Sequence, residues 1–128
     1  MSWLPKLHRE FRIPGDPDKL SHDLVSELRH HGVTVQSHYP GSRIIGSVLR
    51  PMSMSGGQQL RVDFRPIARG EIEAVVESRF RFPGVDFTHE NEKNVAIVEE
   101  LLQRLSGLPP AAVAAAAMRG DATGATAA

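Results

Sequence analysis

Apolar and polar residues alternate with a period of two along residues 60–65 and again along residues 71–82. Such alternation is typical of strands that bury one face only. Between the two stretches, a three-residue loop at Ala68-Arg69-Gly70 would give Gly70 the positive φ that glycine adopts readily. The pattern therefore predicts a β-hairpin. Its apolar face would consist of Leu60, Val62, Phe64, Ile72, Ala74, Val76, Phe80 and Phe82.

Charges indicate the register of this hairpin. With the loop at residues 68–70, Arg65 lies opposite Glu73 and Arg61 lies opposite Glu77. A shift of two residues in either direction would put Asp63 opposite a glutamate, and like charges directly opposite each other are destabilising. The same register predicts two apolar pairs on the other face, Phe64 with Ala74 and Val62 with Val76.

Two further stretches carry apolar residues at helical spacing. Asp16 can cap the first helix, Pro17 suits its first turn because the missing N–H costs nothing there, and Gly32 suits its C-terminal end. The second helix is expected from Glu90 to Leu105. The buried stripes would be Leu20, Leu24, Val25 and Leu28 in the first helix, and Asn94, Val95, Val98, Leu101, Leu102 and Leu105 in the second.

Three other stretches, residues 7–13, 33–39 and 43–50, have the pattern of strands. If Ile44 of the last stretch faces the core, then Ile45 and Leu49 are left on the outer face of the sheet. In residues 33–39, one side would carry Val33, Val35 and Tyr39, and the other side Thr34, Gln36 and His38.

Together these elements follow the order β-α-β-β-β-β-α. This order predicts an α+β two-layer sandwich, in which a mainly antiparallel sheet of about five strands has both helices on one face. In the order of its elements the chain is similar to a shortened helix-grip domain, as in START-type lipid carriers. We expect a single domain over residues 1–108, followed by an alanine-rich, disordered tail over residues 109–128.

Composition excludes several classes of function. The chain has 128 residues and no cysteine, so it has no cysteine nucleophile, thiolate metal site or disulfide. Its formal net charge is zero, which removes the overall field that would attract nucleic acid or an anionic membrane. The sequence has no apolar run long enough for a membrane span and no signal-peptide pattern at its start. We therefore expect a soluble, cytoplasmic protein that does not bind nucleic acid.

The six histidines do not form a metal-binding pattern. His22 and His30 are about two helical turns apart, and the adjacent His30 and His31 would point about 100° apart on a helix. No pair at ligand spacing has an evident third ligand. The sequence also lacks a cofactor motif, and it has no nucleophile with a general base at a spacing that would indicate a catalytic pair. We therefore expect no metal, no cofactor and no enzymatic activity.

The outer face of the sheet is the candidate functional surface. It would carry arginines around exposed branched aliphatic residues, which is the composition of a contact surface with a polar rim. An ordinary solvated face with weak salt bridges is the alternative. The first hypothesis is thus a small, non-catalytic interaction domain that binds a protein partner or a second copy of itself. The binding residues would be Ile45, Leu49, Val75, Arg43, Arg61, Arg65 and Arg79, with Arg81, Glu71, Glu73 and Glu77 beside them.

A second hypothesis is a carrier of an apolar small molecule, held between the second helix and the sheet as in a helix-grip domain. The same side chains could instead fill the core, because leaving a large cavity would cost much of the stability of so small a domain. The lining residues would be Phe64, Val76, Phe80, Phe82, Val98 and Leu102, with Met52 and Met54 as a mobile lid.

Overall fold

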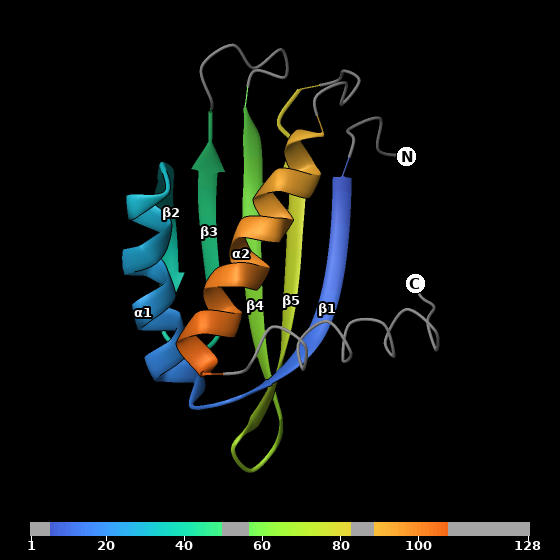
Figure 1. The fold of residues 1–128 in the computed structure, drawn as a ribbon. Helices are drawn as coiled ribbons and strands as arrows, with labels where there is room; N and C mark the ends of the chain where they lie inside the picture. The colour runs from blue at the N-terminus through green and yellow to red at the C-terminus, as the bar shows by residue number, and fades with distance from the viewer. Residues whose placement is uncertain (1–5, 50–56, 83–88, 108–128) are drawn as a thin grey trace.

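One antiparallel sheet with two helices against one of its faces makes up the described part of the protein (Figure 1). The computed structural model describes residues 6–49, 57–82 and 89–107. The order of elements and the α+β fold class predicted from the sequence are confirmed. The expected tail at residues 109–128 lies outside the described residues. The elements are β1 (Lys6–Pro14), α1 (Pro17–His30), β2 (Val33–Tyr39), β3 (Arg43–Val48), β4 (Gln58–Ala68), β5 (Glu71–Phe80) and α2 (Glu90–Ser106).

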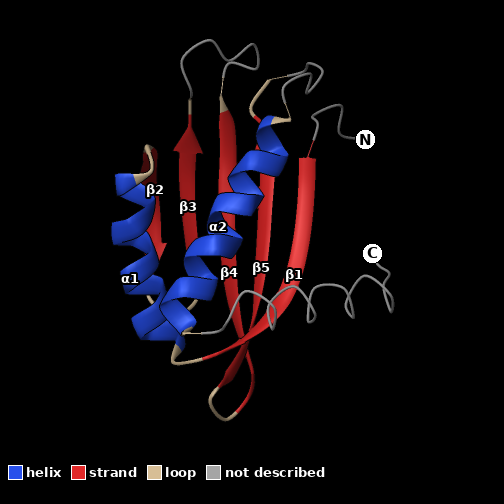
Figure 2. Cartoon of the chain, in the orientation of Figure 1, coloured by secondary structure: helices blue, strands red, loops and turns tan. Residues whose placement is uncertain are grey.

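The strands are ordered β1-β5-β4-β3-β2, and every neighbouring pair is antiparallel. β1 and β2 are therefore the edge strands. Both helices lie on the same side of the sheet (Figure 2), where their apolar stripes are buried. The opposite side of the sheet, which we call the outer face, has no helix over it among the described residues.

The hairpin of β4 and β5 has the predicted register, but its turn is shorter than predicted. Arg65 pairs with Glu73, and Arg61 with Glu77, as the charges indicated. The three-residue loop is wrong, because Ala68 also pairs with Glu71 and the register shifts between Pro66 and Ala68. The extra residue between Pro66 and Ala68 forms a β-bulge. It lies beside Pro66, which has no backbone N–H to donate to the neighbouring strand. Gly70 has the expected positive φ, 75°.

The two helices begin and end close to the predicted residues. The Asp16 side chain accepts a hydrogen bond from the Lys19 backbone N–H at 3.1 Å, and Pro17 is the first residue of α1. α2 is followed by its C-cap Gly107, which has the left-handed conformation that glycine tolerates at a helix end. The predicted stripes are buried against the sheet, through Leu20, Leu24, Val25 and Leu28 of α1 and Val95, Val98, Leu101 and Leu102 of α2.

The prediction for the last residues of β2 was wrong. A bulge between Val35 and Ser37 inserts one residue, so the sides of the strand exchange after it. As a result His38 lies on the helix side, with its Nε2 atom 3.3 Å from Ser21 Oγ of α1. Tyr39 lies on the outer face and is 58% exposed, instead of sharing the core side with Val33.

Replacing Gly46 by alanine is expected to destabilise the protein by about 1–3 kcal/mol, as overpacking does in other cores. Gly46 is buried in β3, and a Cβ atom there would lie 2.7 Å from Val33 Cγ1 and 3.3 Å from the Thr34 carbonyl oxygen. A branched side chain and a backbone atom have little freedom to move away. Urea denaturation would measure the loss, with Ser47→Ala as a control on the same strand. A Gly46→Ala variant as stable as the control would contradict the expected clash.

Candidate functional site

The helices leave the outer face of the sheet uncovered in the described part of the chain (Figures 1 and 2). The alternation of each strand and the pairing of its neighbours determine which residues lie on it. They are Lys6, His8, Glu10 and Arg12 of β1, Glu71, Glu73, Val75, Glu77 and Arg79 of β5, Gln59, Arg61, Asp63 and Arg65 of β4, Arg43, Ile45 and Ser47 of β3, and Thr34, Ser37 and Tyr39 of β2.

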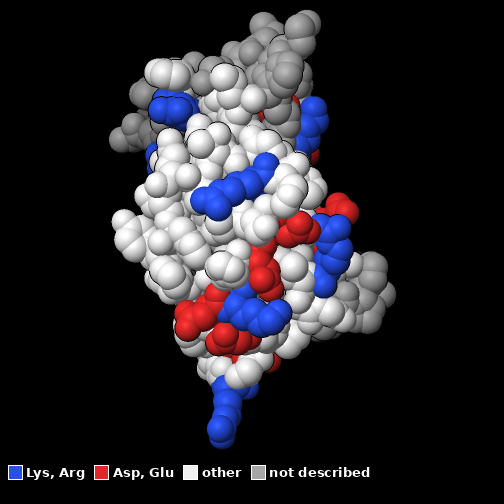
Figure 3. All heavy atoms as spheres, turned by 90° about the vertical axis from the view of Figure 1, so that its left-hand side faces the viewer, with Lys and Arg blue, Asp and Glu red and all other residues white. Residues whose placement is uncertain are grey.

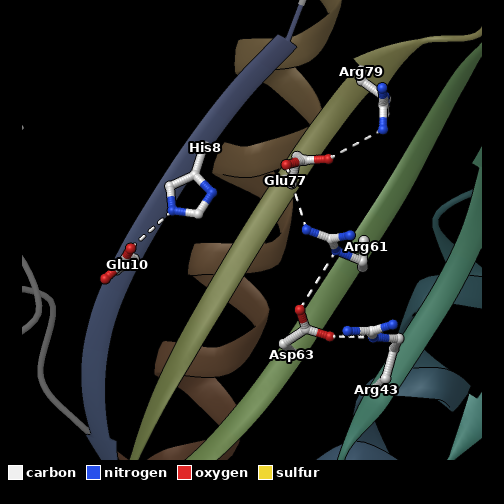
Figure 4. A network of polar contacts seen from close by, with 7 residues as sticks. All are labelled: His8, Glu10, Arg43, Arg61, Asp63, Glu77 and Arg79. Carbon is white, nitrogen blue, oxygen red and sulfur yellow. Dashed lines mark hydrogen bonds and ion pairs between the residues drawn. The ribbon is translucent and has the colours of Figure 1, made fainter.

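A chain of ion pairs crosses the middle of this face (Figure 4). Arg43 Nε lies 2.6 Å from Asp63 Oδ1, and Arg61 Nε lies 3.4 Å from Asp63 Oδ2. Arg61 also reaches Glu77 Oε2 at 3.5 Å, and Arg79 lies 3.9 Å from Glu77 Oε1. Three guanidinium groups from three strands thus alternate with two carboxylates. We call these five residues the charge network.

The two carboxylates of the charge network are largely shielded from water. The side chains of Asp63 and Glu77 are each 12% exposed. Each has two arginine partners, which offsets the cost of burying its charge. The hydrogen bond to Asp63, together with its charge, raises the pKa of the Arg43 guanidinium above its ordinary value. The network therefore holds its two carboxylates between arginines of three neighbouring strands and forms part of the packing of the outer face.

Two other arginines predicted for this face lie apart from the charge network. Arg65 makes a single weak pair with Glu73, at 3.5 Å, near the hairpin turn. Arg81 lies just beyond the end of β5, where its guanidinium approaches Ser47 Oγ at 3.5 Å. The predicted arginines are therefore divided along the length of the sheet instead of forming one cluster.

Val75 differs from the prediction, because it is not exposed. Its side chain lies on the outer face but is only 2% exposed. Glu10 and Asp63 stand directly opposite it on the two neighbouring strands, and Glu73 and Glu77 flank it along β5. Side chains at such positions are close enough to cover a shorter one. The expectation of an exposed apolar residue at this position was therefore wrong.

Two of the exposed apolar side chains, those of Tyr39 and Leu49, lie toward β2 and β3. Leu49, which follows β3, is 67% exposed. Ile45 is half-buried, and Tyr39 lies opposite Arg43 at the margin of the charge network. We call Tyr39, Ile45 and Leu49 the apolar stripe. Figure 3, which views the molecule from the side of α1 and β2, shows charged side chains gathered low on that side and few across its middle.

The residues predicted to line an interior ligand site divide into three groups. Phe64, Val76, Val98 and Leu102 are buried in the hydrophobic core, and Phe80 is buried as well. Phe82 is instead 58% exposed, so it does not face the interior with the others. Met52 and Met54 lie outside the described residues. Burial of these five side chains fits core packing, and the ligand site between α2 and the sheet stays a prediction.

Sequence reasoning missed a buried polar cluster between α2 and the sheet. Asn94 of α2 donates hydrogen bonds through Nδ2 to Gln58 Oε1 of β4, at 3.1 Å, and to Ser78 Oγ of β5, at 2.9 Å. Ser78 Oγ donates in turn to Asn91 Oδ1 at 2.8 Å. All four residues are buried. The cluster lies at the N-terminal end of α2, while the core beneath the rest of the helix is apolar.

One atom of this cluster has no hydrogen-bond partner among the residues that the structure describes. Asn94 is 2% exposed, and its Oδ1 atom is buried without a donor. Exchanging the oxygen and nitrogen of the amide would only transfer the deficit to Nδ2, because both existing bonds use the same end of the side chain. Buried polar groups are nearly always paired, so this position is exceptional.

The described residues give no support to a metal site. No group of three His, Asp or Glu side chains in residues 6–49, 57–82 and 89–107 could hold a metal ion. His8 lies 2.9 Å from Glu10, and His30 and His31 bond to backbone oxygens of their own helix. Among the helices of these ranges, none is long and apolar enough to span a membrane.

No protein-family model matches the chain, and no curated protein is significantly similar to it. Solved structures are similar. The Aha1 dimer from Colwellia psychrerythraea has 12% sequence identity and a TM-score of 0.59, with 80% of this chain and 96% of that chain covered. The Mll3558 protein from Rhizobium loti has 20% identity and a TM-score of 0.54, with 79% and 96% covered.

A third similar structure is the di-domain ARO/CYC StfQ from the steffimycin biosynthetic pathway. It has 10% identity and a TM-score of 0.55, and the match covers 81% of this chain and 51% of that chain. The present chain therefore corresponds to about half of StfQ. At such identities the likeness establishes the fold alone. The chain has a helix-grip, Aha1-like α+β fold.

Proposed function

We propose that the chain is a small interaction domain that binds a protein through the outer face of its sheet, on the β2–β3 side. The apolar stripe of Tyr39, Ile45 and Leu49 beside the charge network carries this proposal. Exposed apolar residues next to ordered arginine–carboxylate pairs give the apolar centre and polar rim of a contact surface. The partner we put forward for testing is a second copy of the chain, which the dimeric state of the similar Aha1 structure supports.

The contact is expected to use the face of the sheet and not its β2 edge. β2 is an edge strand, and an edge strand could extend the sheet into another molecule. However, the bulge between Val35 and Ser37 interrupts its regular hydrogen-bonding pattern. The same bulge turns Tyr39 onto the outer face, so it disfavours edge pairing and enlarges the apolar stripe.

Leu49→Asp is expected to convert the self-associated protein to a monomer that is still folded. Leu49 is largely exposed, so an aspartate there costs the monomer little, whereas it would be desolvated in a contact. Analytical ultracentrifugation over a range of concentrations would measure the assembly, and circular dichroism would verify the fold. Ile67→Asp is the matched control, because Ile67 is also an exposed apolar residue but lies beside the hairpin turn.

Two results would contradict the proposed self-association directly. One is a Leu49→Asp variant that assembles as the unmodified protein does. The other is an unmodified protein that stays monomeric at concentrations of about 100 μM, well above the micromolar range of ordinary weak interactions. Equal losses from Leu49→Asp and Ile67→Asp would also count against it, because they would indicate a general effect of added negative charge.

The unpaired Asn94 Oδ1 atom favours a second candidate function, the binding of a small molecule between α2 and the sheet. The ligand would be mainly apolar, with one hydroxyl or amide donor directed at the polar cluster. The likeness to the ARO/CYC protein is one of fold, and we assign no reaction to this chain. Native mass spectrometry of protein purified without denaturation tests this candidate. Added mass that Asn94→Ala removes would support it, and a bare protein mass would oppose it.

A further inference from the structure

One pair of residues on the outer face departs from the charge matching of the rest of the sheet. Lys6 of β1 stands directly opposite Arg79 of β5. The other directly opposed charged pairs of the described strands join opposite signs, as Arg61 with Glu77 and Arg65 with Glu73 do. Like charges at directly opposed positions are destabilising. In a sheet whose register otherwise matches charges, this exception calls for a counter-charge.

The row of residues that contains this pair has no carboxylate. Ser47, Gln59, Arg79 and Lys6 lie side by side across four strands, because each is paired with the next. The row therefore offers a hydroxyl, an amide, a guanidinium and an ammonium group. Arg81 lies two residues beyond Arg79 and reaches the Ser47 hydroxyl at 3.5 Å.

The nearest carboxylate along β5 does not neutralise this row. Glu77 lies one row away, and it already pairs with Arg61 at 3.5 Å. Its distance to the Arg79 guanidinium is 3.9 Å, which is too long for a strong hydrogen bond (Figure 4). Three cationic side chains, Lys6, Arg79 and Arg81, thus lie at this end of the face, and the one carboxylate that Arg79 approaches is already shared with Arg61.

A shallow pocket lies among these residues. It has a volume of about 250 Å³, opens to solvent, and is lined by Gln59, Arg79, Phe80 and Arg81. A water molecule takes up roughly 30 Å³ of liquid, so a tetrahedral or planar anion fits with space to spare. Because the pocket is open, it suits the charged group of a larger molecule as well as a free ion.

We propose that this pocket binds an anionic group, a phosphate or a carboxylate, between Arg79 and Arg81. The planar guanidinium groups can each donate two parallel hydrogen bonds to such a group. The Gln59 amide adds a neutral donor, and the Lys6 ammonium adds charge from the neighbouring strand. A bound anion would also remove the repulsion between Lys6 and Arg79. This site does not depend on self-association, because none of its lining residues belongs to the apolar stripe.

The test is a titration of the full chain with inorganic phosphate, and separately with acetate, followed by ¹H–¹⁵N NMR at constant ionic strength. We expect saturable shifts confined to the signals of Ser47, Gln59, Arg79 and Arg81. Arg79→Gln should raise the Kd about tenfold, equivalent to ~1.4 kcal/mol. Arg12→Gln is the matched control, because Arg12 is an exposed arginine of the same face that lies away from the pocket. The probe that binds more tightly identifies the preferred anion.

Shifts that grow linearly without saturation, or equal weakening by Arg79→Gln and Arg12→Gln, would overturn the proposal, because both indicate only general attraction to positive charge. Lys6→Gln provides a second variant on the edge strand and should also weaken binding. Repeating the titration with a Leu49→Ser variant, which removes the apolar side chain from the proposed contact without placing a carboxylate near Arg81, separates the two proposals. Retained phosphate binding by that variant shows the anion site to be independent of assembly, whereas lost binding would contradict the site as described.

Discussion

Asn94→Ala is expected to lower the free energy of unfolding by about 2–4 kcal/mol, which is a large part of the stability of a small domain. The substitution removes both hydrogen bonds that Asn94 Nδ2 donates, to Gln58 at 3.1 Å and to Ser78 at 2.9 Å. Each such bond contributes about 1 kcal/mol net, and a buried acceptor that loses its donor costs about 1–3 kcal/mol more. A small void adds to this loss.

Urea denaturation would measure this effect, and two further variants identify its cause. Glu100→Ala lies on the exposed side of the same helix and should change stability by no more than about 0.5 kcal/mol. Asn94→Leu fills the space of the side chain but cannot donate hydrogen bonds. If Asn94→Leu restores the stability that alanine loses, the void and not the hydrogen-bonded cluster accounts for the effect. An Asn94→Ala variant as stable as Glu100→Ala would mean that the cluster contributes nothing.

The sequence contains enough to predict most of the fold, because the elements follow from local patterns. Alternation defines β4 and β5, and the opposite charges of Arg61 and Glu77 define their register before any contact is known. A bulge leaves no such pattern. The extra residue between Val35 and Ser37 changes the side of the sheet on which Tyr39 lies. The packing of neighbouring strands determines where such a bulge forms.

The polar cluster left a signal in the sequence that could have been used. Asn94 is a polar residue on an otherwise apolar helical stripe, and Ser78 stands on the inward side of β5. Polar residues at core positions of two elements indicate that they meet, because neither could be buried alone without cost. The partner Gln58 could not be found in this way, because it depends on where β4 begins.

The candidate site was only partly predictable for a similar reason. The register shows which residues share the outer face, but not how far long side chains extend over short ones. Val75 was expected to be exposed because it is an aliphatic residue at an outward position, yet it is 2% exposed. Its environment depends on β1, the edge strand that pairs with β5 although it is distant in sequence.

Val75→Asp is therefore expected to destabilise the monomer strongly, by about 3–5 kcal/mol. Removing a fully buried valine costs about 1.5–3 kcal/mol in lost burial of apolar surface. The new carboxylate would also stand directly opposite Glu10 and Asp63, and between Glu73 and Glu77 on its own strand. Each directly opposed like charge adds a further unfavourable contribution of roughly 0.2–1 kcal/mol, and burial of the new charge adds more.

Val75→Thr is the control that separates charge from shape, because threonine has nearly the same volume and the same branching. It should cost only about 1–2 kcal/mol, since its hydroxyl can donate to the neighbouring carboxylates. Urea denaturation at low and high salt would measure both variants, and salt should reduce the difference between them by screening the repulsion. If Val75→Asp were no less stable than Val75→Thr, the four carboxylates could not be the groups that enclose Val75. If aspartate is far worse, Val75 belongs to a packed layer of the outer face and is not available as an exposed contact residue.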